Sequence, residues 1–452
     1  MINMLLSKAA ASIHGNLAGE DLLFNGCSTD SRRMAGGELF IALRGEHFDG
    51  HAFVDQARNN GAAAAMVEKM FSGRDRMPLL IVDDTRRAMG SLAGFWRSCF
   101  SIPLIAVTGS NGKTTVKEMI ASILSRTAPV LSTTGNLNND IGVPMTLFSL
   151  ADHHRFAVIE MGANHPGEIA ALTRIARPTV AIITQCAPAH LEGFGSIDGV
   201  AKAKAEIFEG LKQGGTAIVN ADDDYAGLWR DKARTFHQIS FSMRSAADIY
   251  ATDISFDPAT NEYSFVLHVD DVETGVQLPL PGTHNIQNAL AAAACSVALG
   301  IDIKTIREGL ENVEPIKGRL QIKRGRCGAR ICDDTYNANP ASLNAALSVV
   351  SAYPGKHWLI LGDMGELGSA TASMHYAAGE NARAAGFERL FALGPLSAQA
   401  VAGFGTGAMH FAAAEQLAEV VNAGLSEDVN VLVKGSRAMA MERIVDAISE
   451  VT

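Results

Sequence analysis

The sequence predicts an α/β protein of three domains. Its 452 residues are enough for two to four domains of roughly 100–200 residues each. Short apolar runs rich in β-branched residues alternate with helical patterns, and many of these runs end in polar loops. Such loops gather at the carboxyl edge of a parallel sheet. We expect a small N-terminal α/β domain at residues 1–99, a central parallel sheet at 100–313 and a Rossmann-like domain at 314–452.

Composition and charge argue against several classes of protein. The formal net charge is −10, without long runs of one sign, which disfavours a nucleic-acid-binding surface. The six cysteines are scattered with no CxxC pair, so we expect buried thiols in a reducing compartment. Met1–Gly15 is a poor secretion signal, and Ala289–Leu299 is shorter than the roughly 20 residues of a membrane span. The sequence favours a cytoplasmic protein with no membrane insertion.

The N-terminal segment alternates short strands with polar turns. A helical pattern ends at Asn60-Gly61, a strand follows at Leu79–Val82, and another helix is expected over Arg86–Phe95. Four polar residues of the turns are candidate ligand contacts, although such residues commonly only stabilise turns. They are Asp30, Ser31, Arg32 and Asp49.

The stretch that follows residue 101 predicts a phosphate-binding loop. An apolar strand, Ile102–Val107, leads into a loop of glycines and small polar residues, and a helical pattern comes next. The loop reads Thr108-Gly109-Ser110-Asn111-Gly112-Lys113-Thr114-Thr115. Lys113 would reach the terminal phosphates of a nucleotide, and Thr114 would hold a magnesium ion. The first glycine of the general GxxxxGK[ST] pattern is missing because position 107 is a valine, and a turn that merely caps the helix is the alternative.

Two further strands end in residues that can bind metal ions. Glu160 follows the strand Phe156–Ile159, where a carboxylate beside the phosphate loop can hold magnesium. His190 comes after the strand Val180–Thr184 and is a second metal-ligand candidate. A solvated carboxylate and a structural histidine are the respective alternatives.

Helical geometry distinguishes two neighbouring lysines. Lys204 lies four residues after Val200 and four before Phe208, on the apolar stripe, whereas Lys202 lies about 200° away around the helix. An inward ammonium is unfavourable unless it is paired or chemically changed. The alternative is a side chain that reaches solvent or a carboxylate.

Amide side chains form two further candidate groups. Asn136, Asn138 and Asn139 lie in a loop that either binds a ligand or simply connects two elements. Asn285 and Asn288 share one face of an alanine-rich helix, and their donors and acceptors suit a purine edge, although each could be a helix cap. Between these groups, we expect a solvated turn at 222–224 and antiparallel strands over 249–280.

The last segment predicts a second sheet with ligand loops at one edge. Four strands lead into helices, and they are expected at Ala329–Cys332, His357–Leu361, Arg389–Leu393 and Val429–Val433. Polar loops follow them, including 333–340, 362–368 and 434–437. The segment lacks GxGxxG, so a dinucleotide site is not expected.

Together, these motifs resemble the Mur ligases of peptidoglycan assembly, over essentially the whole chain. The resemblance rests on the loop 108–115, which matches the family's GxxGK[ST] form, and on Asp30-Ser31-Arg32, Asp49-Gly50-His51, Glu160-Met161-Gly162, His190, Lys204, His284-Asn285, Asn288-Ala289 and Gly318-Arg319. Residues 334–340 and 362–368 are similar to the member that adds D-alanyl-D-alanine to the UDP-N-acetylmuramoyl tripeptide. The DNPR-type motif of the diaminopimelate-adding member is absent.

The resemblance implies a UDP-binding N-terminal domain, a central P-loop ATPase domain and a C-terminal domain for the incoming amine. It implies that ATP phosphorylates the tripeptide carboxylate and that the amine then attacks the acyl phosphate. Lys113, Glu160, His190 and Lys204 would be catalytic, with Thr114 and Glu160 on one Mg²⁺ and His190 and carbamylated Lys204 on a second. ATP would contact 108–115, Asn285, Asn288, Arg319 and Asp334. The two other substrates would contact Asp30, Ser31, Arg32, Asp49, Asn136, Asn138, Asn139, Asn337, Asn339 and Ser436.

The resemblance leaves alternatives open. Another amide ligase of the superfamily, such as a folylpolyglutamate ligase, and a nucleotide-binding module without turnover both remain. We expect a monomer whose partners are small substrates rather than nucleic acid. The identity of the third tripeptide residue, diaminopimelate or lysine, does not follow from the sequence.

Overall fold

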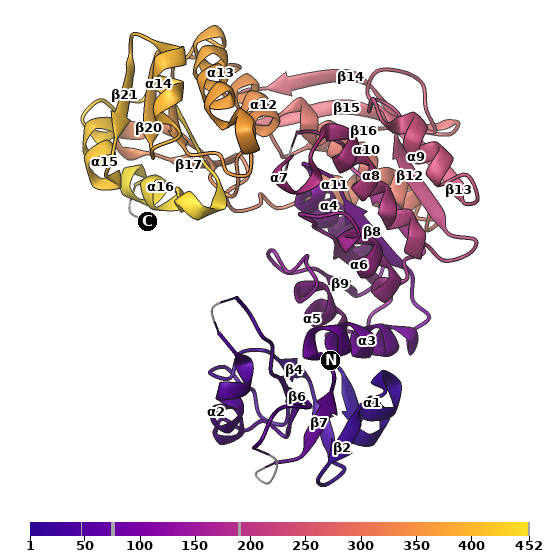
Figure 1. Cartoon of the computed structure of the whole chain (residues 1–452). Helices are drawn as coiled ribbons and strands as arrows, with labels where there is room; N and C mark the ends of the chain where they lie inside the picture. Colours follow the sequence, from indigo (N-terminus) through magenta and orange to yellow (C-terminus); the bar gives the residue numbers. More distant parts are fainter. Residues whose placement is uncertain (47, 74–76, 189–190, 451–452) are drawn as a thin grey trace.

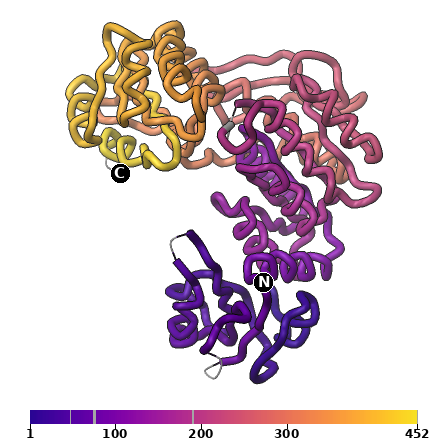
Figure 2. Tube along the Cα trace, in the orientation of Figure 1, coloured from indigo at the N-terminus to yellow at the C-terminus, as the bar shows by residue number. Residues whose placement is uncertain are grey.

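The computed structural model describes residues 1–46, 48–73, 77–188 and 191–450. Figure 1 shows the N-terminal sheet, the central sheet and the C-terminal sheet as successive bodies of an extended molecule. The Cα trace in Figure 2 shows that the two chain ends lie in different bodies. The three sheets fall within residues 16–82, 104–278 and 321–434. This arrangement confirms the predicted fold class, while the exact domain boundaries stay a prediction.

The N-terminal sheet has five strands in the order β2-β7-β6-β5-β4. Its strands pair in parallel except for β2, which joins antiparallel at one edge, and β1 pairs with β3 separately. The expected helix that ends before Asn60 and the strand Leu79–Val82 are both present. The elements are β1 (Asn3–Leu5), α1 (Leu6–Ile13), β2 (Asn16–Ala18), β3 (Leu23–Asn25), β4 (Cys27–Ser28), β5 (Leu39–Ile41), η1 (Gly50–Phe53), α2 (Val54–Asn59), β6 (Ala64–Glu68), β7 (Leu79–Val82) and α3 (Thr85–Ser98).

The central sheet has nine strands in the order β16-β15-β14-β13-β12-β11-β8-β10-β9. The strands from β9 to β14 pair in parallel, and β14, β15 and β16 form the expected antiparallel addition. Its strands are β8 (Leu104–Thr108), β9 (Val130–Ser132), β10 (Phe156–Glu160), β11 (Val180–Ile183), β12 (Thr216–Asn220), β13 (His237–Ser242), β14 (Ile249–Asp257), β15 (Glu262–Val269) and β16 (Val272–Leu278). Its helices are α4 (Lys113–Ser125), α5 (Gly142–Phe148), α6 (Glu168–Ala176), α7 (Leu191–Phe194), α8 (Ile197–Ala205), η2 (Glu206–Gly210), α9 (Ala226–Lys232), α10 (Thr283–Val297) and α11 (Ile303–Glu311).

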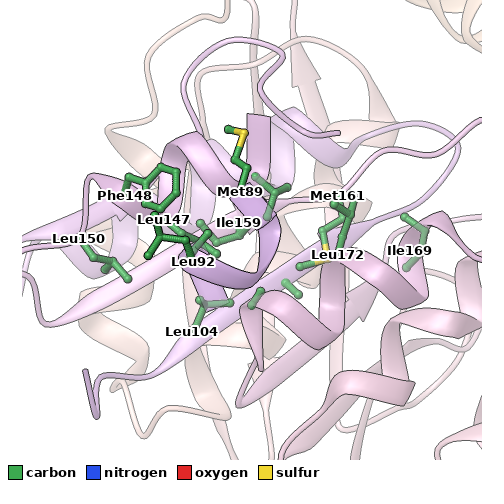
Figure 3. Packing of buried hydrophobic residues seen from close by; sticks show 14 of the residues in the cluster. Met89, Leu92, Leu104, Leu147, Phe148, Leu150, Ile159, Met161, Ile169 and Leu172 are labelled. Carbon is green, nitrogen blue, oxygen red and sulfur yellow. The ribbon is translucent and has the colours of Figure 1, made fainter. Parts of the chain in front are cut away.

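Apolar side chains join the N-terminal and central domains in one core. Met89 and Leu92 of α3 belong to the same buried cluster as Leu147 of α5 and Leu172 of α6, as Figure 3 shows. Full burial of such a side chain contributes about 1.5–3 kcal/mol. The end of α3 is also fixed, because the buried Arg97 donates hydrogen bonds to the carbonyl oxygens of residues 100, 102 and 176.

The C-terminal sheet has six strands in the order β17-β18-β22-β19-β20-β21. The four predicted strands are present, and two edge strands, β17 and β21, add to them. The sequence hides β17 because it is polar, and β21 because it is short and largely exposed. The elements are β17 (Gln321–Arg324), η3 (Arg326–Gly328), β18 (Arg330–Asp334), α12 (Pro340–Val350), β19 (Lys356–Gly362), η4 (Gly368–Ala370), α13 (Thr371–Ala384), β20 (Arg389–Leu393), α14 (Ala398–Phe404), β21 (Ala408–Phe411), α15 (Ala414–Asn422), β22 (Val429–Lys434), η5 (Arg437–Met439) and α16 (Glu442–Ile448).

No helix in the described part of the chain is both long and apolar enough to cross a membrane. The alanine-rich helix α10 is instead buried in the core of the central domain, beside α4 and α11. Its composition therefore reflects close helix packing within the protein.

Candidate active site

A cleft of about 1350 Å³ lies between the central and C-terminal domains. Its walls include the loops that follow β8, β10 and β11 on one side and β18, β19 and β22 on the other. The N-terminal domain contributes Glu46 and Arg86, and Arg86 pairs with Asp140 at 2.9 Å. Ligands collect at the carboxyl edges of open α/β sheets, and here two such edges share one cleft.

Two glycines give the loop after β8 its shape. Gly109 has φ of +147°, and a Cβ there would lie 1.9 Å from Thr184 Oγ1. Gly112 has φ of +81° and precedes α4, and a Cβ there would lie 2.5 Å from Asn288 Oδ1. Side chains at these positions would displace the loop, so its backbone can follow this path only with glycine. The buried Val107 belongs to β8, which explains why the general pattern lacks its first glycine.

The hydroxyl of Thr114 and the carboxylate of Glu160 meet at the floor of the cleft. Thr114 donates a hydrogen bond of 2.9 Å to Glu160 Oε2, and Asn138 Nδ2 donates one of 2.8 Å to Glu160 Oε1. Lys113 Nζ donates to the carbonyl oxygen of Gly109 at 2.8 Å. Burial lowers the pKa of Lys113, and the negative charge of Glu160 partly opposes this effect. The strand–loop–helix therefore places the ammonium of Lys113 near the Thr114–Glu160 pair, and the binding of magnesium by this pair stays a prediction.

Two side chains of the C-terminal domain reach across the cleft to this loop. Arg319 Nη2 donates to Thr114 Oγ1 at 2.8 Å, and Asn339 Nδ2 donates to Asn111 Oδ1 at 2.8 Å. The guanidinium of Arg319 also lies 4.3 Å from the ring centre of Tyr336. Arg319 Nε and Asn111 Nδ2 are buried donors that have no protein acceptor among the described residues. Phosphate oxygens are the acceptors that such donors fit.

The paired amides of α10 lie where the sequence predicts them. Asn288 Nδ2 donates to Asn285 Oδ1 at 3.0 Å, both side chains are buried, and both line the cleft. Gly112 packs against Asn288, so this pair is next to the phosphate loop. In the loop 108–115, Ser110, Asn111 and Thr115 line the cleft. Thr108 is buried instead and donates a hydrogen bond to the carbonyl oxygen of Met161.

An ion pair organises the loop after β18. Lys434 Nζ contacts Asp334 Oδ2 at 2.5 Å and donates to the carbonyl oxygen of Asn337 at 2.9 Å. Lys434 and Asp334 are partners in the register of β22 and β18. Lys434 is not among the site residues predicted from the sequence. A lysine that ends a strand of otherwise buried residues carries the same signal as the inward Lys204 and could have identified it.

The structure confirms that the two lysines of α8 differ. Lys204 is 1% exposed and lines the cleft, whereas Lys202 is exposed. Burial and the nearby positive charge of Lys113 lower the pKa of Lys204 to about 7. A substantial neutral fraction therefore exists near neutral pH, and a neutral amine is the form that reacts with carbon dioxide. The proposed partner His190 lies outside the described residues.

The donor set fits one magnesium ion held jointly by protein and substrate. The described residues contain no group of three or more His, Cys, Asp or Glu side chains placed to hold a metal. Thr114 and Glu160 supply two oxygens, and Mg²⁺ commonly binds through one or two protein ligands together with phosphates and water. For a second ion, Lys204 faces the same cleft, but its amine would have to become a carbamate to bind a cation.

The proposed substrate residues fall into two groups. Asn136, Asn138, Asn139, Asn337, Asn339 and Ser436 line the cleft. The N-terminal group lies elsewhere: Asp30 pairs with Arg32 at 2.9 Å, Ser31 donates to Gln56 at 2.7 Å, and Asp49 contacts His51 Nδ1 at 2.6 Å. The hydrogen bonds from Arg32 lower the pKa of Asp30 to about 2. These four residues do not line the main cleft, and their binding role stays a prediction.

The acidic turn at 222–224 is hydrogen-bonded to the backbone, whereas its sequence predicts a simply solvated turn. Asp222 accepts a hydrogen bond from the backbone N–H of Met243 at 2.7 Å, and Asp223 accepts one from that of Cys186 at 2.7 Å. Their carboxylates therefore hold backbone amides near β11 and β13 and are not merely solvated.

Comparison with known proteins agrees with this geometry. Family models match in three consecutive parts: Mur ligase family, catalytic domain, at 23–97; Mur ligase middle domain at 107–296; and Mur ligase, glutamate ligase domain, at 318–437. A protein of Escherichia coli (strain K12) is 43% identical over 453 residues, which cover 100% of this chain and 99% of that protein. The chain belongs to the Mur ligase family. The Escherichia coli protein is named UDP-N-acetylmuramoyl-tripeptide--D-alanyl-D-alanine ligase, as is a Bacillus subtilis (strain 168) protein that is 32% identical, with 100% and 99% covered.

Solved structures place this Mur ligase in the same group. A crystal structure of MurF from Acinetobacter baumannii has a TM-score of 0.93 and 36% identity, with 99% of this chain and 98% of that chain covered. The MurF ligase of Thermotoga maritima, solved in complex with ADP, has a TM-score of 0.84 and 27% identity, with 94% and 96% covered. These likenesses confirm the three-part architecture of this Mur ligase.

Proposed function

We propose that this Mur ligase joins D-alanyl-D-alanine to UDP-N-acetylmuramoyl-tripeptide at the expense of ATP, during cytoplasmic peptidoglycan synthesis. The observation that carries the proposal is the junction of Arg319 with the Thr114–Glu160 pair. It joins a phosphate loop to an amine-binding domain in one cleft, as a carboxylate-activating ligase requires. The names of the relatives over their full length support this choice of substrates.

In the proposed reaction, an oxygen of the tripeptide carboxylate attacks the γ-phosphorus of ATP, and ADP leaves. The amine of D-alanyl-D-alanine, after losing a proton, attacks the carbonyl carbon of the acyl phosphate, and inorganic phosphate leaves as the amide forms. Both steps need stabilisation of negative charge more than a nucleophilic side chain. Lys113 and Arg319 supply positive charge beside the loop, while Asn285 and Asn288, which are hydrogen-bonded to each other, would bind the adenine.

Thr114 and Glu160 would hold the first magnesium ion, and His190 and a carbamylated Lys204 the second. Magnesium, when bound, offsets charge on the phosphoryl group that is transferred. Asp334 lies on the C-terminal side of the cleft, where ribose contacts are expected, and its pairing with Lys434 fixes its orientation. The N-terminal domain would bind the UDP part through Asp30, Ser31, Arg32 and Asp49. We propose a monomer as the working unit, since residues of one chain supply all these parts.

Acceptor selection tests the proposal. The purified enzyme would receive ATP, magnesium and UDP-N-acetylmuramoyl-tripeptide, with D-alanyl-D-alanine, L-alanine, D-glutamate, diaminopimelate or L-glutamate as the acceptor. We expect a product only when D-alanyl-D-alanine is the acceptor. Its mass should equal that of the UDP-tripeptide plus the dipeptide minus one water. Ligation of a single amino acid in preference to the dipeptide would favour another member of the superfamily, and binding of ATP without any product would favour a nucleotide-binding module.

A further inference from the structure

The C-terminal domain brings several cations to the cleft, and they differ in how firmly they are engaged. Among the described residues that line the cleft, those cations are Arg319, Lys434 and Arg437. Arg319 is bound to Thr114 and stacks on Tyr336, on the nucleotide side. Lys434 is 2% exposed and tied to Asp334. Both side chains therefore already have close protein partners within the site.

Arg437 is engaged in a different way. Its side chain is 60% exposed and pairs with Glu442 Oε1 at 2.8 Å. An exposed ion pair of this kind contributes only about 0–1 kcal/mol, so little free energy opposes its exchange for another anion. A guanidinium has five N–H donors, and it can bind a second carboxylate while it keeps the first.

The backbone that carries Arg437 is firmly placed. It follows directly from β22, the buried strand that ends at Lys434, and begins the short helix η5. The N–H of the preceding Ser436 donates to the carbonyl oxygen of Asp363 at 2.9 Å, which ties this loop to the one after β19. Gly365 of that second loop faces Ser436, since a Cβ there would be in van der Waals contact with its side chain, 3.9 Å from the nearest atom. A fixed backbone therefore presents an exposed guanidinium to the cleft.

We infer that Arg437 binds the terminal carboxylate of the incoming dipeptide and thereby selects an acceptor that carries a free carboxylate. The inference rests on the proposed function. The dipeptide has two charged ends: its amine must approach the acyl phosphate near Lys113, and its carboxylate needs a cation away from the phosphates. Arg437 meets this requirement because it lies on the C-terminal wall of the cleft and is not engaged by the nucleotide loop.

The test compares two acceptors, D-alanyl-D-alanine and D-alanyl-D-alaninamide, which lacks the negative charge. For the wild-type enzyme, we expect kcat/KM to favour the acid by about 10- to 100-fold, the range of a charge-assisted hydrogen-bonded pair. For Arg437→Gln, we expect this preference to fall to about one, through a higher KM for the acid. The KM values for ATP and for the UDP-tripeptide should not change, and Arg437→Lys should retain part of the preference.

Arg326→Gln serves as the matched control, because Arg326 is an exposed arginine of the same domain that does not line the cleft. It should keep the wild-type preference. The inference is overturned if the wild-type enzyme does not prefer the acid, if Arg437→Gln keeps the full preference, or if it loses activity equally with both acceptors. A wild-type enzyme that ligates neither acceptor but uses a different amine would overturn the proposed function itself, and this inference with it.

Discussion

At the residue scale, the buried amine of Lys204 is the most informative single group. Its position on the apolar stripe of a helix predicted burial, and the structure confirms that the side chain is 1% exposed. Burial and Lys113 lower its pKa to about 7, so the amine does not remain a full cation. A carbamate formed on this nitrogen would replace a poorly placed positive charge with an anion that could bind the second magnesium ion that we propose.

Replacement of Lys204 tests whether ligation needs a carbamate on this particular lysine of α8. We expect Lys204→Ala to lower the ligation rate by about 10- to 100-fold, the usual cost of removing a group that supports a metal site, and short carboxylates to restore part of it. In carbon-13 NMR with labelled bicarbonate, a carbamate signal should appear for the wild-type enzyme and be absent for Lys204→Ala.

Lys202→Ala is the matched control, two residues away on the exposed face of the same helix. It should keep both the activity and the carbamate signal. Full activity in Lys204→Ala, or a carbamate signal that survives in that variant, would contradict the assignment.

At the scale of single elements, the strand–loop–helix at β8 and α4 forms the loop at which we propose that phosphates bind. The two glycines of the loop have neighbours that exclude a Cβ, namely Thr184 and Asn288. Thr184 directly follows β11 and Asn288 lies on α10, so the loop is shaped by parts of the chain far away in the sequence. Its glycine spacing thus reflects tertiary packing as well as local turn geometry.

Gly112→Ala tests this element. An alanine would need a positive φ, which is unfavourable by roughly 1–2 kcal/mol, and its Cβ would overlap Asn288 Oδ1. We expect the Kd of ADP, measured by calorimetry, to rise by about tenfold or more. Gly227→Ala, on α9, has no atom within 4 Å of its added Cβ and should bind ADP normally. Unchanged ADP affinity in Gly112→Ala would show that the loop does not depend on this glycine.

The helices and strands also show how much of the fold can be predicted from the sequence alone. Strands with a clear apolar pattern, such as Leu79–Val82, were predicted with their exact bounds. The edge strands β17 and β21 were missed because one face or one side of each is solvated, so their hydrophobic signal is weak. The inward position of Lys434 at the end of a buried strand was readable from the sequence, whereas its pairing with Asp334 depends on a cross-strand register that only the folded sheet creates.

At the scale of the whole molecule, the three domains are joined in two distinct ways. A continuous apolar core and the hydrogen bonds of Arg97 fasten the N-terminal domain to the central one. The C-terminal domain instead meets the phosphate loop through polar contacts, the pairs Arg319–Thr114 and Asn339–Asn111. Polar contacts of this kind exchange readily for contacts with a nucleotide, so we expect the C-terminal domain to adjust when substrates bind.

Interdomain contacts of this kind are what the sequence could least predict. Motifs identified Arg319 and Asn339 as site residues, but no local pattern indicated that they touch Thr114 and Asn111, more than 200 residues away. The resemblance to the family implied the roles of these residues, whereas their contacts with the loop are known only from the structure. The N-terminal candidates Asp30 and Arg32 show the opposite case, in which a motif is matched and the structure pairs the two residues with each other, away from the main cleft.

The most direct test of the whole account is the substrate dependence of ADP release. ADP would be measured with ATP and magnesium alone, with the UDP-tripeptide added, with D-alanyl-D-alanine added, and with all substrates together. Because the acyl phosphate must be consumed by the amine, we predict sustained ADP formation only in the complete mixture, in a one-to-one ratio with the ligated product. Sustained release without the dipeptide, or no release in the complete mixture, would contradict the account.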